Sequence, residues 1–566
     1  MFHRPHSAFL RFLLAVFLMF MLSDGVLAKP SKSFAETIAA SSDSTPSTGG
    51  EQPTKKIPAR TITSSLQMTV WAKVAGNNWI FVGNTPGTVH LPKCQECLFI
   101  LVGLTSENLS EYHRELDRNG IRQIGMPEGT TNSRLRQYCD AGLFENVTSL
   151  SLAKSKLTDL TPLAKLTNLT SLDLSYCKNL TDLAPVAGLT NLTSLNLHWC
   201  EQLVDIMPVA QLTNLRALDL SLCYKLPDIT PIAKLKNLTS LILWRCDNLT
   251  DISPIAGLEN LTLLDLSYCC RLKDITPIAQ LKKLTSLDLR GCKSLTDLTP
   301  VSRLENLTTL NLSSCRKVAD ITALATSRKL STLSLRYCDN ITDITPLAGL
   351  TNLSSLKLDC EKLTDLTPIA ELKNLTSLEL GCENLTDISL VAALEDLQSL
   401  DLRCCYNLTD LKPLAGLKKL TSLSLLGCYK LTDLTPLAQL KNLTSLFLSG
   451  DKLVDITPIS ELTQLTSLYL LRCKELTNIA PISRLTNLTS LALSGDALTD
   501  ITPIASLKNL RSLGLDCKNL TDLTPVLELK TLRILDLRDC PKLKSRDVKR
   551  IRKHLPDCKI ETAKLR

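Results

Sequence analysis

Cysteine is the residue type in this 566-residue chain that is best suited to chemistry, and the chain has 21 of them. Cys94 and Cys97 form a CQEC segment, the one pair close enough to form a bridge or to act in redox exchange. No second CxxC pair and no histidines stand at ligand spacing, so zinc is not favoured. We favour a structural bridge or two simple thiols over catalysis at this pair.

Most of the other cysteines recur at a fixed interval. They fall at positions 177, 200, 223, 246, 269, 292, 315 and 338, and later units of the same length, or shorter by one position, continue to Cys540. If the units stack as coils about 4.8 Å apart, equivalent Cβ atoms stay wider than the roughly 3.8 Å that a disulfide prefers. Many cysteines in an exported chain ordinarily suggest a disulfide framework. Here we expect a column of buried free thiols instead.

Two further columns are similar to functional motifs. Asn-Leu-Thr, an acceptor for N-glycosylation, begins at Asn168, Asn191, Asn237, Asn260, Asn306 and Asn374. Because the same asparagine precedes nearly every strand position, we favour a side chain that bonds its own backbone in a turn, in a host without this modification, which suggests bacteria. Aspartates equivalent to Asp159 and Asp182 lack the glycine-rich nonapeptide of calcium-binding β-rolls, so bonds to backbone N–H groups are favoured over calcium.

The sequence lacks the usual catalytic signatures. It has no phosphate loop, no dinucleotide fingerprint, no HExxH and no nucleophile elbow. After residue 28 the histidines are His90, His113, His198 and His554, which are too scattered to suggest a base paired with a nucleophile. We therefore expect no enzyme activity, no cofactor and no metal.

One repeated unit must position all these residues, and residues 166–188 spell it as LTNLTSLDLSYCKNLTDLAPVAG. A fixed period of roughly 20 to 29 residues with an LxxLxL core indicates a leucine-rich-repeat solenoid. Leucine alternates with polar residues over 171–175, as in a strand, and Thr161-Pro162 predicts a threonine N-cap before a short helix or 3₁₀ turn. We predict an α/β solenoid, a horseshoe or superhelix with a concave parallel sheet and convex helical or 3₁₀ segments.

The repeats are similar to those of a known family. The lead-in LTNLTSL and the segment LTDLTPLA make residues 143–540 resemble bacterial internalins and related secreted leucine-rich-repeat proteins. Internalin-like units have Asn three positions after the second strand leucine, whereas the longer units here have Cys, as at Cys177, like the cysteine-containing repeats of F-box partners. The shorter units place Glu361, Glu383, Asp451, Asp496 or Lys518 there. The resemblance implies recognition of proteins and names no receptor.

The ends of the chain differ from the repeats. Arg4 and Arg11 precede an apolar run too short to span a bilayer, closed by Val26-Leu27-Ala28, which predicts a secretory signal peptide. A Ser/Thr/Pro-rich stretch then predicts a disordered linker. The expected organisation is a signal peptide at 1–28, linker at 29–63, β-rich head and N-terminal cap at 64–142 with a helix at 107–119, about 17 repeats at 143–540, and a basic capping helix and tail at 541–566. In that last helix Val548, Ile551 and Leu555 form an apolar stripe.

The net charge of +8 does not indicate a polyanionic partner. Residues 541–566 hold ten Lys/Arg against three acids, the signal peptide adds one positive charge, and residues 29–540 are therefore close to neutral. We expect no nucleic-acid partner and no transmembrane span.

If the leucine core and the turns are the same in every repeat, binding specificity lies in the outward strand positions. The column of Asp173 is acidic at first, and the two columns that follow gather aromatic and arginine residues, the types enriched in interface hot spots. The competing interpretation is that these aromatics merely cover the sheet edge. The candidate partner-binding residues are His198, Trp199, Trp244, Arg245, Tyr268, Arg290, Arg336, Tyr337, Phe447, Tyr469 and Leu471.

The sequence predicts an exported, monomeric, non-enzymatic protein that is secreted, periplasmic or at the cell surface. It would bind a macromolecule through the concave face, a protein before a glycan. One alternative is an enzyme, for example a thiol redox enzyme, in the head around Cys94 and Cys97. Another is an adaptor in a ubiquitin-type complex, which conflicts with the signal peptide and the lack of a recognisable F-box.

Overall fold

The computed structural model describes residues 122–562 and the backbones of five earlier strands between residues 60 and 101. The predicted signal peptide, Cys94, the predicted helix at 107–119 and residues 563–566 lie outside the described residues, as do the side chains of the five early strands. The chain forms two compact units. We call the described residues up to 317 the N-terminal unit and those from 318 onward the C-terminal unit.

The N-terminal unit begins with antiparallel pairs. β1 (Arg60–Ser64) pairs with β4 (Gly87–Leu91), and β2 (Met68–Val74) pairs with both β3 (Asn78–Asn84) and β5 (Glu96–Leu101). β5 then runs parallel to β6 (Gln123–Gly125), which pairs with the first repeat strand. β1 thus starts inside the segment that composition assigned to the linker.

A short parallel strand from each repeat builds the sheet of each unit. In the N-terminal unit these are β7 (Ser149–Ser151), β8 (Ser171–Asp173), β9 (Ser194–Asn196), β10 (Ala217–Asp219), β11 (Ser240–Ile242), β12 (Leu263–Asp265), β13 (Ser286–Asp288) and β14 (Thr309–Asn311). In the C-terminal unit they are β15 (Thr332–Arg336), β16 (Ser355–Asp359), β17 (Ser377–Leu380), β18 (Ser399–Asp401), β19 (Ser422–Leu425), β20 (Ser445–Ser449), β21 (Ser467–Leu471), β22 (Ser490–Ser494), β23 (Ser512–Asp516), β24 (Ile534–Leu537) and β25 (Lys559–Thr562). Pairing is in register, so equivalent residues such as Leu172 and Leu195 lie side by side.

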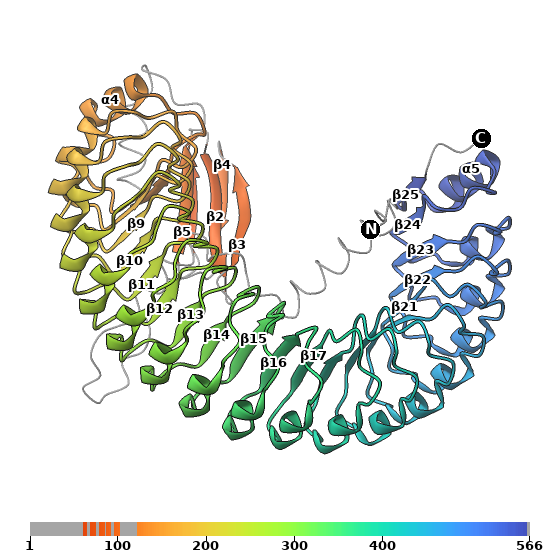
Figure 1. Ribbon diagram of the computed structural model, residues 1–566. Helices are drawn as coiled ribbons and strands as arrows, with labels where there is room; N and C mark the ends of the chain where they lie inside the picture. The colour runs from red at the N-terminus through yellow and green to blue at the C-terminus, as the bar shows by residue number, and fades with distance from the viewer. Residues whose placement is uncertain are drawn as a thin grey trace. The chain divides into compact units, whose positions relative to one another are not determined.

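Opposite each strand, every coil makes a 3₁₀ turn, so that strands line one side of the coils and turns the other (Figure 1). The turns of the N-terminal unit are η1 (Thr161–Lys165), η2 (Ala184–Gly188), η3 (Met207–Gln211), η4 (Thr230–Lys234), η5 (Ser253–Gly257), η6 (Thr276–Gln280) and η7 (Thr299–Arg303). Those of the C-terminal unit are η8 (Thr322–Thr326), η9 (Thr345–Gly349), η10 (Thr367–Glu371), η11 (Ser389–Ala393), η12 (Lys412–Gly416), η13 (Thr435–Gln439), η14 (Thr457–Glu461), η15 (Ala480–Arg484), η16 (Thr502–Ser506) and η17 (Thr524–Glu528).

The cap of these turns differs from the prediction. Thr161 is the first residue of η1 rather than its N-cap, and its N–H donates to Asp159 Oδ1 at 2.8 Å. The same bond recurs from Met207 to Asp205 and from Thr230 to Asp228, at 2.7 Å each. The aspartate column therefore fixes the turns through bonds to backbone N–H groups, as the sequence predicted.

Stacked leucines fill the space between strands and turns. Leu172, Leu174 and Leu180 are fully buried, and their equivalents recur in every described coil. Two short helices, α4 (Asn132–Asp140) and α5 (Ser545–His554), lie beside the first and last coils of the array. The apolar stripe predicted for the second helix is buried at Val548, Ile551 and Leu555. The structure therefore confirms the leucine-rich-repeat solenoid. In the described part of the chain, no helix is long and apolar enough to cross a membrane.

Candidate functional site

Three columns of side chains cover the strand side of each unit, at positions equivalent to Asp173, Ser175 and Tyr176. We call these columns the strand face. The third column follows the strand and has a left-handed backbone, with φ of 61° at Tyr176, 58° at Trp199, 60° at Tyr268 and 57° at Tyr337. Gly291 and Gly427 occupy the same position in other coils, also at positive φ. Glycine adopts this conformation without strain, whereas a large residue adopts it only at a cost in conformational energy.

On the N-terminal unit, aromatic rings from three coils contact one another. The His198 ring lies 5.2 Å from Tyr176 and 6.4 Å from Trp199, centre to centre. On its other side it stacks on Trp244, two coils away, with centres 6.1 Å apart and planes 10° apart. Tyr176 and Trp199 are 5.1 Å apart. We call Tyr176, His198, Trp199 and Trp244 the ring cluster.

Charged and polar groups accompany the ring cluster. The Lys178 ammonium lies 4.4 Å above the Trp199 ring and 2.9 Å from Glu201, to which the Trp199 indole N–H also donates. The indole N–H of Trp244 is buried and has no hydrogen-bond partner. An unpaired buried donor costs free energy unless a further group accepts from it.

Carboxylates lie in the first column beside these rings. Asp173 and Asp219 are 6% and 7% exposed. The N–H groups of Ser175 and Ser221 donate to their Oδ1 atoms at 2.9 and 2.8 Å, and Ser151 Oγ donates to Asp173 Oδ2 at 2.8 Å. Desolvation by burial raises the pKa of both carboxyls, and the nearby His198 partly opposes this shift.

Further along the same unit, Tyr268 and Arg290 form a pair, with the guanidinium 5.3 Å from the ring centre. Burial, and next the charge of Asp288, raise the pKa of Asp265 to about 7, although Arg290 opposes the shift. The Arg290 Nε is buried without a partner. Arg245 is exposed and lies 5.8 Å from the Tyr224 ring.

The strand face of the C-terminal unit starts with paired charges. Arg336 contacts Glu379, and Arg403 donates through Nε to Asp401 Oδ2 at 2.8 Å. Lys357 stands among them, and burial, together with the charges of the two arginines, lowers its pKa to about 8. Tyr337, in the third column, is 49% exposed.

Apolar side chains follow on β20 to β22. The Phe447 and Tyr469 rings stack with centres 4.6 Å apart and planes 13° apart, and the Tyr469 hydroxyl lies 2.8 Å from Ser490 Oγ. Ala492 completes this buried cluster, and Leu426 and Leu471 pack against it. We call these five residues the apolar patch.

The structure thus brings some of the predicted site residues together and separates others. His198, Trp199 and Trp244 meet in the ring cluster, and Phe447, Tyr469 and Leu471 meet in the apolar patch. Arg245 and Tyr337 project singly, while Arg290 and Arg336 are engaged within the chain.

Several side chains of the first column point away from the leucine core and are nevertheless covered. Phe447 is 9% and Tyr469 is 3% exposed, and Asp173 and Asp219 are equally covered. Strands in register lie about 4.8 Å apart, so large side chains in one column cover one another.

Sequence reasoning also missed Tyr176 and the role of Arg403. An arginine two positions after an acid on the same strand, as in Asp401 and Arg403, lies on the same face and can pair with it. That spacing is the signal that could have separated paired carboxylates from unpaired ones.

The cysteine column has a structural role. Every cysteine between residues 122 and 562 is a free thiol, which confirms the buried-thiol prediction for the repeats. The Cys246 Sγ donates to Leu220 O of the preceding coil at 3.3 Å, and Cys292 does the same to Leu266 O at 3.2 Å. Burial raises the pKa of the Cys177 thiol to about 12, so these sulfurs stay protonated and unreactive.

The asparagine column also differs in detail from the prediction. Asn191 Nδ2 donates to Thr167 O at 2.9 Å and Asn237 Nδ2 to Thr213 O at 3.0 Å, so each side chain ties its coil to the preceding one rather than to its own turn. The amide nitrogen that glycosylation would modify is already engaged.

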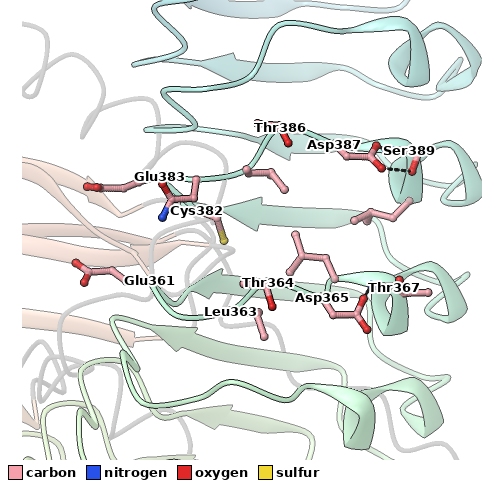
Figure 2. A pocket seen from close by; sticks show the side chains of 14 residues that line it. Glu361, Leu363, Thr364, Asp365, Thr367, Cys382, Glu383, Thr386, Asp387 and Ser389 are labelled. Carbon is pink, nitrogen blue, oxygen red and sulfur yellow. Dashed lines mark hydrogen bonds between the residues drawn. The ribbon is translucent and has the colours of Figure 1, made fainter.

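A cavity of about 300 Å³ opens between two coils of the C-terminal unit (Figure 2). It lies between segments 361–367 and 382–390, where Leu363 and Cys382 are 7% and 5% exposed. Its carboxylates Asp365 and Asp387 each accept the N–H of a turn residue, at 2.8 and 2.7 Å. The cavity is therefore a looser stacking of two coils, in which both aspartates are engaged in turn formation.

Comparison with protein families supports this description. Residues 160–226 and 207–276 match the model described as Zer-1-like leucine-rich repeats, and residues 259–303, 282–326 and 395–439 match the one described as leucine-rich repeats in two copies. These segments are leucine-rich repeats. No curated protein matches the chain.

Several solved structures are similar. An internalin (inlF) from Listeria monocytogenes is 27% identical, with 61% of this chain and 89% of that chain covered and a TM-score of 0.44. A leucine-rich-repeat protein of Leptospira interrogans is 24% identical, covering 77% and 99%, with a TM-score of 0.46. The functional domain of InlJ from Listeria monocytogenes, which includes a cysteine ladder, is 23% identical, covering 68% and 75%, with a TM-score of 0.41.

Proposed function

We propose that this is an exported protein that binds a protein partner through the strand faces of its leucine-rich repeats. The observation that carries the proposal is the left-handed backbone beneath Tyr176, Trp199, Tyr268 and Tyr337. Such a conformation costs about 1–3 kcal/mol for a non-glycine residue. Gly291 shows that glycine fits the same position, so the non-glycine residues there, Leu222 and Ser314 as well as the aromatic ones, are kept at a cost to folding.

The chemistry of these side chains supports binding to a protein. Aromatic residues and arginine dominate the hot spots of protein interfaces, whereas leucine, isoleucine, valine and cysteine fill the cores of the coils. The ring cluster offers large rigid aromatic surfaces. On the C-terminal unit, the exposed Tyr337 ring and the partly buried Leu426 and Leu471 of the apolar patch offer a second set of contacts.

The test compares variants on opposite sides of one solenoid. Residues 29–566 are used to capture partners from the native surroundings of the protein, and the Kd of the recovered partner is then measured. The face variant carries Trp244→Ala and Arg245→Ala. The control carries Val204→Ala and Met207→Ala, which remove exposed apolar side chains, 52% and 58% exposed, around turn η3. We expect the face variant to weaken binding by about 2 kcal/mol, roughly thirtyfold in Kd, and the control to bind like the wild type.

Stability must be measured beside affinity, because the two face residues differ. Arg245 is exposed, so Arg245→Ala alone changes the free energy of unfolding by less than about 0.5 kcal/mol. Trp244 stacks on His198, so its truncation also lowers the thermal midpoint. A partner that binds the wild type and the face variant equally, and loses affinity with the control, would exclude the strand face.

Export is proposed from the segment Met1–Ala28 alone, and it is tested independently. We expect N-terminal sequencing of the protein recovered outside the cytoplasm to begin at Lys29. A mature chain that starts at Met1 and remains in the cytoplasm would contradict export without bearing on the binding site.

A further inference from the structure

Carboxylates on the two strand faces differ in the groups that donate to them. On the C-terminal unit, Glu379 and Asp401 have arginine partners, and Asp536, which is fully buried, accepts from Arg538 at 2.6 and 2.8 Å. On the N-terminal unit, no lysine or arginine within residues 122–562 forms an ion pair with Asp173 or Asp219, whose donors are backbone N–H groups and serine hydroxyls. Glu379, Asp401 and Asp536 thus have arginine partners, whereas Asp173 and Asp219 have none among the described residues.

Burial makes this difference costly. A carboxylate taken out of water without a positive partner is destabilised, and the raised pKa values of Asp173 and Asp219 reflect that penalty. The group that opposes the shift at both carboxyls is the imidazole of His198, which follows the strand between them. A cation brought in from outside would offset the same penalty.

The ring cluster is suited to receive such a cation. Aromatic faces attract ammonium and guanidinium groups that approach within about 6 Å of the ring centre. Trp199 already does so with Lys178, at 4.4 Å. Beside it, the half-buried Trp244 ring stacks on His198 and extends the aromatic surface.

We propose that Asp173 and Asp219, with the rings of Tyr176, His198 and Trp244, form a binding site for a lysine or arginine side chain of the protein partner. The ligand supplies the positive charge that the C-terminal unit takes from its own arginines. This inference rests on the proposed function and specifies which group of the partner docks on the N-terminal unit. A neutral sugar would stack on the rings and leave the two carboxylates uncompensated.

The test uses three labelled peptides of the same length. At alternate positions the first peptide has Lys or Arg, the second has Gln and the third has Glu. Their binding to residues 29–566 is followed by fluorescence anisotropy. We expect the basic peptide to bind and the other two not to bind. Asp173→Asn with Asp219→Asn should weaken binding at least about tenfold, a loss of about 1.4 kcal/mol. Asparagine is compatible with the fold, because Asn196 holds the equivalent position between them and accepts the same backbone bond.

The matched control is Asp182→Asn with Asp228→Asn. These exposed aspartates belong to the turns of the same coils, so the net charge changes equally while the strand face is intact. A second variant, His198→Lys, places a resident ammonium between the two carboxylates and should also weaken binding of the basic peptide. This variant tests the site even if the asparagine pair fails to fold.

Four outcomes would overturn the inference. If both aspartate pairs weaken binding of the basic peptide equally, the peptide is attracted by the overall charge of the protein. If the Gln peptide binds as tightly as the basic peptide, the site does not recognise positive charge. Unchanged affinity in both the face pair and His198→Lys means that the site is elsewhere. Loss of the native partner by Trp244→Ala with Arg245→Ala, but not by the face pair, would leave the proposed function standing and remove only this inference.

Discussion

Replacing Asp265 by asparagine should stabilise the protein at neutral pH. Burial and the charge of Asp288 raise the pKa of Asp265 from 3.8 to about 7. The folded state therefore binds a proton that the unfolded state, with a carboxyl pKa near 3.9, has already released at pH 7. Stability from this group is fully present below about pH 4 and is lost as the pH rises through about 7, because the folded state must then ionise a buried carboxyl.

The magnitude follows from the size of the shift. About three pKa units at 1.36 kcal/mol each give a penalty that approaches about 4 kcal/mol above pH 7. The introduced asparagine would not ionise and would keep the local bonds, since Ser267 N donates to Asp265 Oδ1 at 2.8 Å and Asn311 accepts the same bond from Ser313 at 3.1 Å. Asp265→Asn should therefore match the wild type near about pH 4 and exceed it near about pH 8.

The assay is urea denaturation followed by circular dichroism at those two pH values. The control is Asp401→Asn at the same repeat position in the C-terminal unit. That carboxylate accepts from Arg403 N and Nε at 3.0 and 2.8 Å, so its loss should cost about 1.5–3 kcal/mol at neutral pH. If both variants destabilise equally at about pH 8, the reasoning about uncompensated burial is refuted.

Three further predictions concern the frame. Under native conditions the repeat cysteines should resist alkylation and react only after denaturation without reductant; finding most of them already in disulfides, by mass spectrometry, would contradict the thiol ladder. Hydrogen exchange should be faster at 320–328 and 387–395 than in flanking coils, since Ala323 and Leu390 replace the usual turn proline; uniform protection across the coils would exclude this. Tyr469→Phe keeps the stack on Phe447 and loses the bond to Ser490, so it should cost about 1 kcal/mol in unfolding experiments, and no loss would mean that this bond is not formed.

The solenoid core could be predicted from the sequence because the same repeated unit occurs many times. Inward leucines and the cysteine column recur at a fixed interval, and stacking then dictates that equivalent residues meet. The buried state of Cys177 and the apolar stripe at Val548 and Ile551 followed directly. The turn caps were predicted less well, because threonine and aspartate can each cap a turn and only the backbone path shows that Asp159 does so.

The candidate site was harder to predict, because it depends on what the neighbouring coil places beside each residue. Period-two alternation shows that Phe447 and Tyr469 point away from the leucine core, and it does not show that they cover each other. The stack of His198 on Trp244 spans two coils, so no spacing within one unit reveals it. The left-handed backbone at Trp199 was equally hidden, since only the glycines at equivalent positions hint at it.

Two unfavourable features coincide on the strand face of the N-terminal unit: bulky residues at left-handed positions, and the buried carboxylates of Asp173 and Asp219, which have no lysine or arginine partner among the described residues. Neither is required by the repeat, because Gly291 fits the first position and Asn196 the second. A solenoid can carry both, since each coil is stabilised by its own core and by its two neighbours. Residues that lower the stability of the fold are expected at functional sites, where they are retained for their function. Their coincidence around Trp199 and Asp219 is the physical reason to look for the partner there first.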